Sequence, residues 1–143
     1  MKKLLALLLA FALVFSMATF MTACGDDEDS IVGMWKIYSE KIDGRDYEEF
    51  LRIELGDPSE EVIEQEMERE RNRRIEFKSD GTVVISEPGR GDLEGKYEFD
   101  DGKLVLRENG EKEVYEAEIK DDKLYLTLLD KSYEEELVLE RVK

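Results

Sequence analysis

Several residue types on which most enzymes depend are missing or scarce in this chain. Its 143 residues include no histidine, one cysteine and two prolines. Without histidine the chain lacks the commonest general acid and base, the commonest transition-metal ligand and any nucleophile activated by an imidazole. One cysteine excludes an internal disulfide and the spacing of a zinc finger. We therefore expect no catalytic residues, no metal site and no cofactor, and we expect that the protein is not an enzyme.

Positive charge is also in short supply. The chain has 21 lysines and arginines against 37 aspartates and glutamates, which gives a formal net charge of −16. A negative field of this size repels nucleic acid and anionic lipid surfaces. We therefore expect no nucleic-acid partner, and any attachment to a membrane must depend on apolar or acyl groups instead of surface charge.

The chain has one long apolar run, and it lies at the N-terminus. Lys2 and Lys3 precede an apolar segment at 4–20, which leads through Met21-Thr22-Ala23 to Cys24 and an acidic stretch. This order is typical of a secretory signal. With the single cysteine at the junction, the segment resembles a bacterial lipoprotein signal ending in a lipobox, although Met21 stands where that family most often has leucine. The alternative is an uncleaved membrane helix with an incidental cysteine.

The lipoprotein resemblance implies a division of the chain into three parts. Residues 1–23 are then the signal peptide, lipidated Cys24 begins an acidic tether at 24–30, and one domain occupies 31–143. Loss of the two N-terminal lysines brings the mature charge to about −18. Acyl chains such as palmitate on Cys24 would hold the protein on the extracytoplasmic side of a bacterial cell membrane. Which membrane of a two-membrane cell carries the protein stays open.

The domain begins with a predicted strand and continues with two predicted helices. Residues 31–42 have strand character and end at an Asp-Gly turn. Apolar residues then follow helical spacing from Tyr47 to Gly56. A second helix is predicted to open at Asp57-Pro58, with proline at the first helical position, and to run to about Asn72. We expect this helical pair to form a lid.

From Arg74 onward the apolar pattern changes to a period of two, with short turns between the segments. One face of each predicted strand is apolar and the other is charged, so the sheet is expected to curl around its apolar face. This predicts a mainly β fold, a small up-and-down eight-stranded antiparallel barrel with a helical pair between its first and second strands. The eight predicted strands cover 31–42, 74–79, 82–87, 94–100, 103–108, 113–120, 123–129 and 133–142.

Two features of this pattern resemble the lipocalin-like (calycin) barrels. Gly33-Met34-Trp35 opens the first strand and Arg141 lies in the last. The resemblance implies that Trp35 closes the base of the barrel and that Arg141 packs across its ring, a contact favoured by cation–π attraction. The helical pair is similar to the portal of the fatty-acid-binding branch. The Thr-Asp-Tyr turn of true lipocalins is missing, which indicates a divergent, lipocalin-like member.

The resemblance implies a small apolar or amphipathic ligand inside the barrel, gated by the helices. The alternative is a filled barrel that serves as a surface module and engages an unidentified partner protein of the cell envelope, because a small eight-stranded barrel has little space beyond its side chains. Both interpretations stay open at this point. The candidate ligand-lining residues, which would otherwise be core, are Phe77, Tyr97, Phe99, Tyr115 and Leu126.

Three further patterns have simpler explanations than a functional site. The acidic run 26–29 lacks the spaced ligands and turn glycine of a calcium loop and is interpreted as a linker. The glutamates of 59–70 are interpreted as a solvated helix face, and Gly89-Arg90-Gly91 as a hairpin connection.

Overall fold

The computed structural model describes residues 30–129 and 132–143. The predicted signal peptide and Cys24 lie outside the described residues. Within those residues, no helix is long and apolar enough to cross a membrane. The helices are α2 (Tyr47–Glu54) and α3 (Glu60–Asn72). The strands are β1 (Gly33–Ile42), β2 (Arg45–Asp46), β3 (Arg74–Phe77), β4 (Thr82–Glu87), β5 (Gly91–Asp100), β6 (Lys103–Glu108), β7 (Glu111–Lys120), β8 (Lys123–Leu129) and β9 (Glu135–Arg141).

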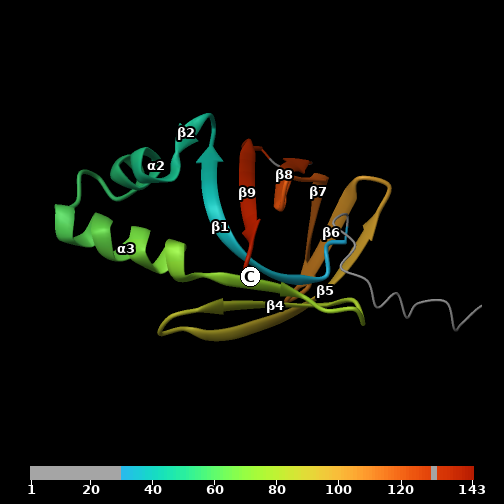
Figure 1. Ribbon diagram of the computed structural model, residues 1–143. Coiled ribbons are helices and arrows are strands. Elements are labelled where there is room, and N and C mark those ends of the chain that lie inside the picture. Colours follow the sequence, from blue (N-terminus) through green and yellow to red (C-terminus); the bar gives the residue numbers. More distant parts are fainter. Residues whose placement is uncertain (1–29, 130–131) are drawn as a thin grey trace, which may run out of the picture.

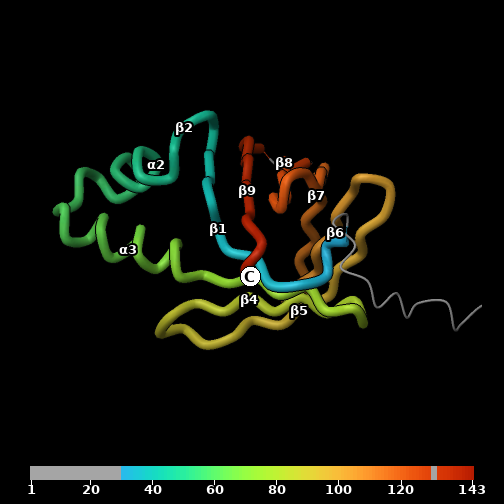
Figure 2. Tube along the Cα trace, viewed as in Figure 1, coloured from blue at the N-terminus to red at the C-terminus, as the bar shows by residue number. Residues whose placement is uncertain are grey.

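The strands form one antiparallel sheet that closes on itself (Figures 1 and 2). From β3 to β9 each strand pairs with the next along the chain, and β1 pairs with both β3 and β9. The two-residue β2 adds only a short ribbon to the end of β1. The predicted mainly β, eight-stranded up-and-down barrel is confirmed, with the helical pair between its first and second long strands.

The pairing of β1 with β3 is shorter than its pairing with β9. It pairs with β3 only from Gly33 to Lys36, but with β9 from Trp35 to Ile42. Beyond Lys36, β1 and β3 are no longer paired. Helix α3 lies against β1 and β4 next to this point of separation (Figure 1). The helical pair therefore sits at the side of the barrel wall, where the wall has lost its backbone pairing.

A β-bulge in β1 changes which side chains face the interior. The register with β9 shifts between Ile37 and Ser39, so one residue is extra on the β1 side. Leu137 and Leu139 of β9 pack against or within the core. Their register partners are Glu40 and Ile37, so both of these β1 residues share the inner face. Simple alternation from Trp35 would have turned Glu40 outward.

The interior is filled with apolar side chains over much of its length. Trp35, Leu104, Leu124 and Leu139 have no exposed surface. Every residue that the alternation assigned to the inner face lies in this core or packs against it. The core and its partly buried neighbours are Ile31, Trp35, Ile37, Ile75, Phe77, Val83, Ile85, Tyr97, Phe99, Leu104, Leu106, Tyr115, Ala117, Ile119, Leu124, Leu126, Leu128, Leu137 and Leu139.

The start of α3 differs from the prediction by two residues. Ser59 is the N-cap, so Pro58 precedes the cap instead of occupying the first helical position. Asp57 has a φ of +64° and belongs to the turn that leaves α2. The Arg52 guanidinium, within about 3 Å of the Glu48 and Glu60 carboxylates, joins the two helices at this turn. The helix starts later because the turn takes up Asp57.

Candidate functional site

One end of the barrel is closed by the tryptophan and arginine that the sequence singled out. Arg141 is the register partner of Trp35, and its guanidinium carbon lies 4.3 Å from the centre of the indole ring. The indole Nε1 donates a hydrogen bond to the Ile31 carbonyl at 2.8 Å. Arg141 donates to the carbonyls of Ser30 at 2.7 Å and Val32 at 3.1 Å. These contacts tie the beginning of the described chain to its last strand.

Gly33 has a defined place in this closure. Its φ is +136°, a region that residues with a Cβ seldom adopt. A Cβ at this position would lie 3.0 Å from Nη1 of Arg141. Glycine therefore lets the chain pass directly beneath the guanidinium that covers Trp35.

The five candidate ligand-lining residues lie in the packed part of the interior. Phe77 and Tyr97 meet edge to face with ring centroids 4.9 Å apart, and the Tyr97 hydroxyl donates to the Lys78 carbonyl at 2.7 Å. Leu126 is buried, Tyr115 is buried, and Phe99 packs against the same cluster. In the structure these residues are part of the packed core, and their contact with a ligand stays a prediction.

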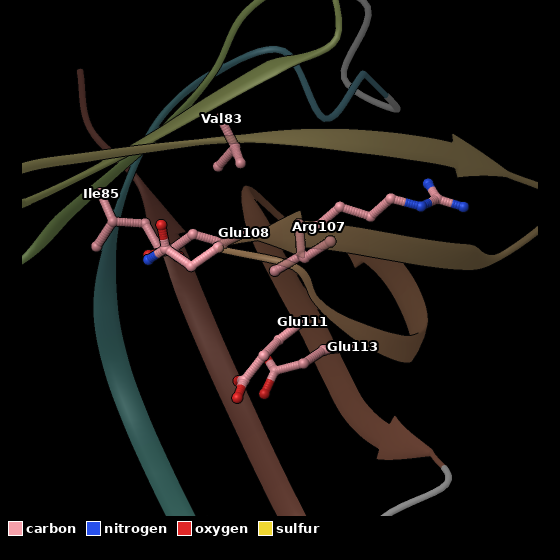
Figure 3. A pocket seen from close by; sticks show the side chains of 8 residues that line it. Val83, Ile85, Arg107, Glu108, Glu111 and Glu113 are labelled. Atoms are coloured by element: carbon pink, nitrogen blue, oxygen red, sulfur yellow. The ribbon is translucent and has the colours of Figure 1, made fainter.

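A cavity of about 370 Å³ lies at the other end of the barrel, between β4, β6 and β7. Figure 3 shows Val83 and Ile85 on one side of it and Glu111 and Glu113 on the other. This volume is near the lower end of the range of about 300–1,000 Å³ that is usual for small-molecule sites. Its lining residues are Val83, Ile85, Leu106, Arg107, Glu108, Asn109, Glu111 and Glu113.

Three carboxylates of this cavity come from the hairpin between β6 and β7. Glu113 lies opposite the inward-packing Leu106, and Glu108 lies directly opposite Glu111, so all three share the inner face. Glu113 accepts a hydrogen bond from the hydroxyl of Tyr115 at 3.1 Å. Burial, followed by the nearby carboxylates of β9 and β7, raises the pKa of this tyrosine. The mouth thus combines an apolar wall with an acidic rim.

More carboxylates reach the same end of the barrel from other strands. The pKa of Tyr133 is raised by burial and then by the charges of Glu135, Glu113, Glu111 and Glu40. Carboxylates from β9, β7 and β1 therefore all lie near enough to the Tyr133 hydroxyl to affect its pKa. Sequence reasoning missed this convergence because these residues are far apart along the chain.

A buried ionic cluster joins helix α3 to the mouth. Arg73, at the end of α3, contacts Glu70 at 2.9 Å and Glu87 of β4 at 2.5 Å. Burial, followed by the charge of Glu70, raises the pKa of Glu40 to about 8. Oε2 of Glu40 and Nε of Arg73 are buried without a hydrogen-bond partner. Only the spacing of Glu70 and Arg73 on one helix was visible in the sequence.

A smaller cavity of about 240 Å³ lies between the helical pair and β1. Tyr47 and Met67 come from the helices, and Ile37 and Glu40 from the strand. Burial, followed by the charges of Glu70 and Glu40, raises the pKa of Tyr47 to about 12. The helices therefore rest on β1 through a loosely filled, partly ionic contact. Among the described residues, no group of three acidic or cysteine side chains is placed to hold a metal ion.

Comparison with known proteins identifies the class. The sequence pattern of the lipocalin-like domain matches residues 31–126, and the chain belongs to this family. The resemblance drawn from Gly33, Trp35 and Arg141 is thereby confirmed. No curated protein sequence matches the chain significantly.

Several solved structures align with the chain at low sequence identity. A DUF4847 family protein from Bacteroides vulgatus aligns with a TM-score of 0.54 and 15% identity, over 83% of this chain and 100% of that chain. Lipid binding protein 8 of Caenorhabditis elegans aligns with a TM-score of 0.46 and 15% identity, over 85% and 100%. A variant of the fluorescent protein UnaG gives 0.41 and 19%, over 79% and 96%.

Proposed function

We propose that this protein binds a small apolar or amphipathic molecule at the open end of its barrel. The observation that carries the proposal is the cavity of about 370 Å³ between β4, β6 and β7, in a barrel that is otherwise packed. Val83, Ile85 and Leu106 offer apolar contacts, while polar groups surround them. An apolar pocket with a few polar groups is the usual form of a small-molecule site.

The second candidate function is a surface module that engages a partner protein. The filled half of the barrel favours it, since Trp35, Leu104 and Leu124 leave no space at the closed end. So does the acidic surface, which would attract a basic partner. The two functions differ in one measurable respect, because only the first requires occupancy of the cavity.

The helical pair is proposed to control access to the interior. Helix α3 lies where the pairing of β1 with β3 has ended, and the ion pair between Arg73 and Glu87 joins the end of the helix to β4. A small movement of α3 would widen the wall without breaking any strand pairing. Lidded sites commonly open by such movements of a connecting segment.

We also propose that the protein is anchored through acyl chains on Cys24 to the extracytoplasmic face of a bacterial cell membrane. The order of charges, apolar run and cysteine in the sequence supports this. Ser30, six residues after Cys24, is held at the closed end by Arg141. Strand β9 runs from Glu135 at the mouth to Arg141 at the closed end, so an anchor near Ser30 would direct the mouth away from the membrane.

Native mass spectrometry of the protein, exported from a bacterial host and purified without denaturation, tests the binding function. We expect a stoichiometric adduct that leaves on unfolding. Leu106→Trp fills the cavity and should remove the adduct, whereas Val105→Trp, on the opposite face of β6, should keep it. A clean mass for the unmodified protein that stays unshifted against a panel of lipids and metabolites would favour the interaction module instead.

The anchor is tested separately from the ligand. Expression of the full chain in a bacterial host should give a protein whose mass includes acyl chains and that fractionates with membranes. Cys24→Ala should abolish both properties. Retention of the N-terminal segment at its unprocessed mass in the unmodified chain would instead identify an uncleaved helix.

A further inference from the structure

Among the residues that the structure describes, no ion pair compensates the carboxylates at the cavity. Glu108 and Glu111 are directly opposite on the inner face of a two-strand ribbon. Like charges in this position destabilise a sheet. Within residues 30–129 and 132–143, neither these two nor Glu113 takes part in an ion pair; their polar contacts are with Asn109 and Tyr115. The folded protein thus retains an unfavourable charge arrangement beside an apolar wall.

Two arginines near the cavity, Arg107 and Arg73, are engaged elsewhere. Arg107 is the one cation among the lining residues, and its side chain extends away from the glutamates (Figure 3). It pairs with Glu98 on the outer face at 3.0 Å. Arg73 is held between Glu70 and Glu87. An anionic ligand would therefore meet repulsion from several carboxylates, and neither of these two arginines is free to offset it.

We propose that this cavity selects a ligand with a positive charge, a cationic amphiphile whose ammonium group lies between Glu111 and Glu113 and whose apolar part contacts Val83, Ile85 and Leu106. The proposal rests on the proposed function, since it specifies the ligand class of the same cavity. Opposite charges are attracted most strongly where water is partly excluded. The ligand would thereby supply a positive charge opposite these carboxylates.

The experiment compares three ligands that share one alkyl chain. Decylammonium, decan-1-ol and decanoate are titrated calorimetrically into the purified protein at low salt. The two ionic ligands are kept below their critical micelle concentrations, and decan-1-ol is kept below its solubility limit. We expect decylammonium to bind at least about tenfold more tightly than decanoate, with decan-1-ol between them. Added salt should weaken the binding of decylammonium and leave that of decan-1-ol nearly unchanged.

Matched variants locate the charge selection. Glu111→Gln and Glu113→Gln should each weaken decylammonium binding about five- to tenfold and change decan-1-ol binding less than about twofold. Glu118→Gln, on the outer face of the same strand, should change neither. Glu111→Gln should also raise the midpoint of urea unfolding of the free protein, because it removes a pair of opposing like charges.

Each outcome decides the proposal. Decanoate that binds as tightly as decylammonium overturns the charge selection and leaves the proposed binding function standing. Decylammonium binding that survives both glutamine substitutions unchanged also overturns it. If none of the three ligands binds, the charge selection and the binding function fail together.

Discussion

Replacement of Glu40 by glutamine tests the ionic cluster between helix α3 and the barrel mouth. The pKa of this carboxyl is raised from 4.5 to about 8. Burial is the largest cause, and the negative charges of Glu70 and Glu135 add to it, while the positive charge of Arg73 lowers the pKa. Between about pH 4.5 and about pH 8, Glu40 is therefore protonated in the folded state and ionised in the unfolded state. Stability from this group is present at low pH and is lost as the pH rises from about 4.5 toward about 8.

The size of the effect follows from the shift. One pKa unit corresponds to about 1.4 kcal/mol, so the rise in the pKa of Glu40 from 4.5 to about 8 sets an upper bound of about 5 kcal/mol. Because the cluster lies beside an open mouth, we expect about 2 kcal/mol of stability to be lost between about pH 5 and about pH 8. Glutamine resembles the protonated acid and its amide can donate to Glu70, so Glu40→Gln should remove the part of the dependence that Glu40 contributes. The pKa of Glu70 is also raised, mainly by burial, so a residual slope of the same sign remains.

Urea unfolding followed by circular dichroism at several pH values measures the free energy of unfolding directly. The lowered pKa values of Glu60 and Asp80 place their titration below this window. The variant should be more stable than the unmodified protein near pH 8 and about equal to it near pH 5, while Glu118→Gln should keep the original slope. A variant with the same slope as the unmodified protein would refute the assignment of a buried, protonated Glu40.

Other substitutions test the closed end and the helix contact by the same unfolding assay. Arg141→Ala should cost about 2–3 kcal/mol, because it removes the cation over Trp35 and two hydrogen bonds to backbone carbonyls, and Arg141→Lys should recover part of the loss; equal stability would contradict the closure. Gly33→Ala should cost about 1–3 kcal/mol, since the glycine has a φ of +136° and lies beneath Arg141, and an unchanged midpoint would show that the strain is absent. Arg73→Met should cost about 3–5 kcal/mol, because it leaves buried Glu70 without a cation and Glu87 with only the exposed Arg90 at 3.7 Å, and a neutral result would show that the cluster is solvated.

The sequence was sufficient to predict the barrel because its strands alternate so regularly. Within each strand from Ile75 to Leu139, apolar residues of the inner face recur at every second position, and short turns separate the strands. The inner face follows from that period alone. The contact at the closed end was predictable for a different reason: Trp35 and Arg141 are recognisable residues in the first and last strands of a familiar barrel.

The mouth could not be predicted in the same way. Glu40 faces inward only because of a β-bulge between Ile37 and Ser39. No residue type in this segment predicts the bulge. Glu111 and Glu113 do follow the inward period of Tyr115, but charged residues at strand ends are usually solvated. Which end of a barrel remains unfilled depends on how all the strands close, which a local pattern does not contain.

The candidate ligand-lining residues were chosen by the same local pattern, and their contact with a ligand stays a prediction. Aromatic residues such as Phe77 and Tyr97 were the largest apolar side chains on the inner face, and so were natural candidates for contact with a ligand. In the structure their size makes them the residues that fill the barrel. The space that is left lies beside smaller side chains, Val83 and Ile85.

Methyl-resolved NMR of isoleucine, leucine and valine groups during titration with decylammonium tests most directly that the open end of the barrel is a binding site. The account predicts saturable shifts at the methyl groups of Val83, Ile85 and Leu106, with little change at outward-facing Val105 or at Leu124 in the closed half. Shifts confined to Val105 and other outer-face methyl groups, or no saturable shifts at all, would contradict it.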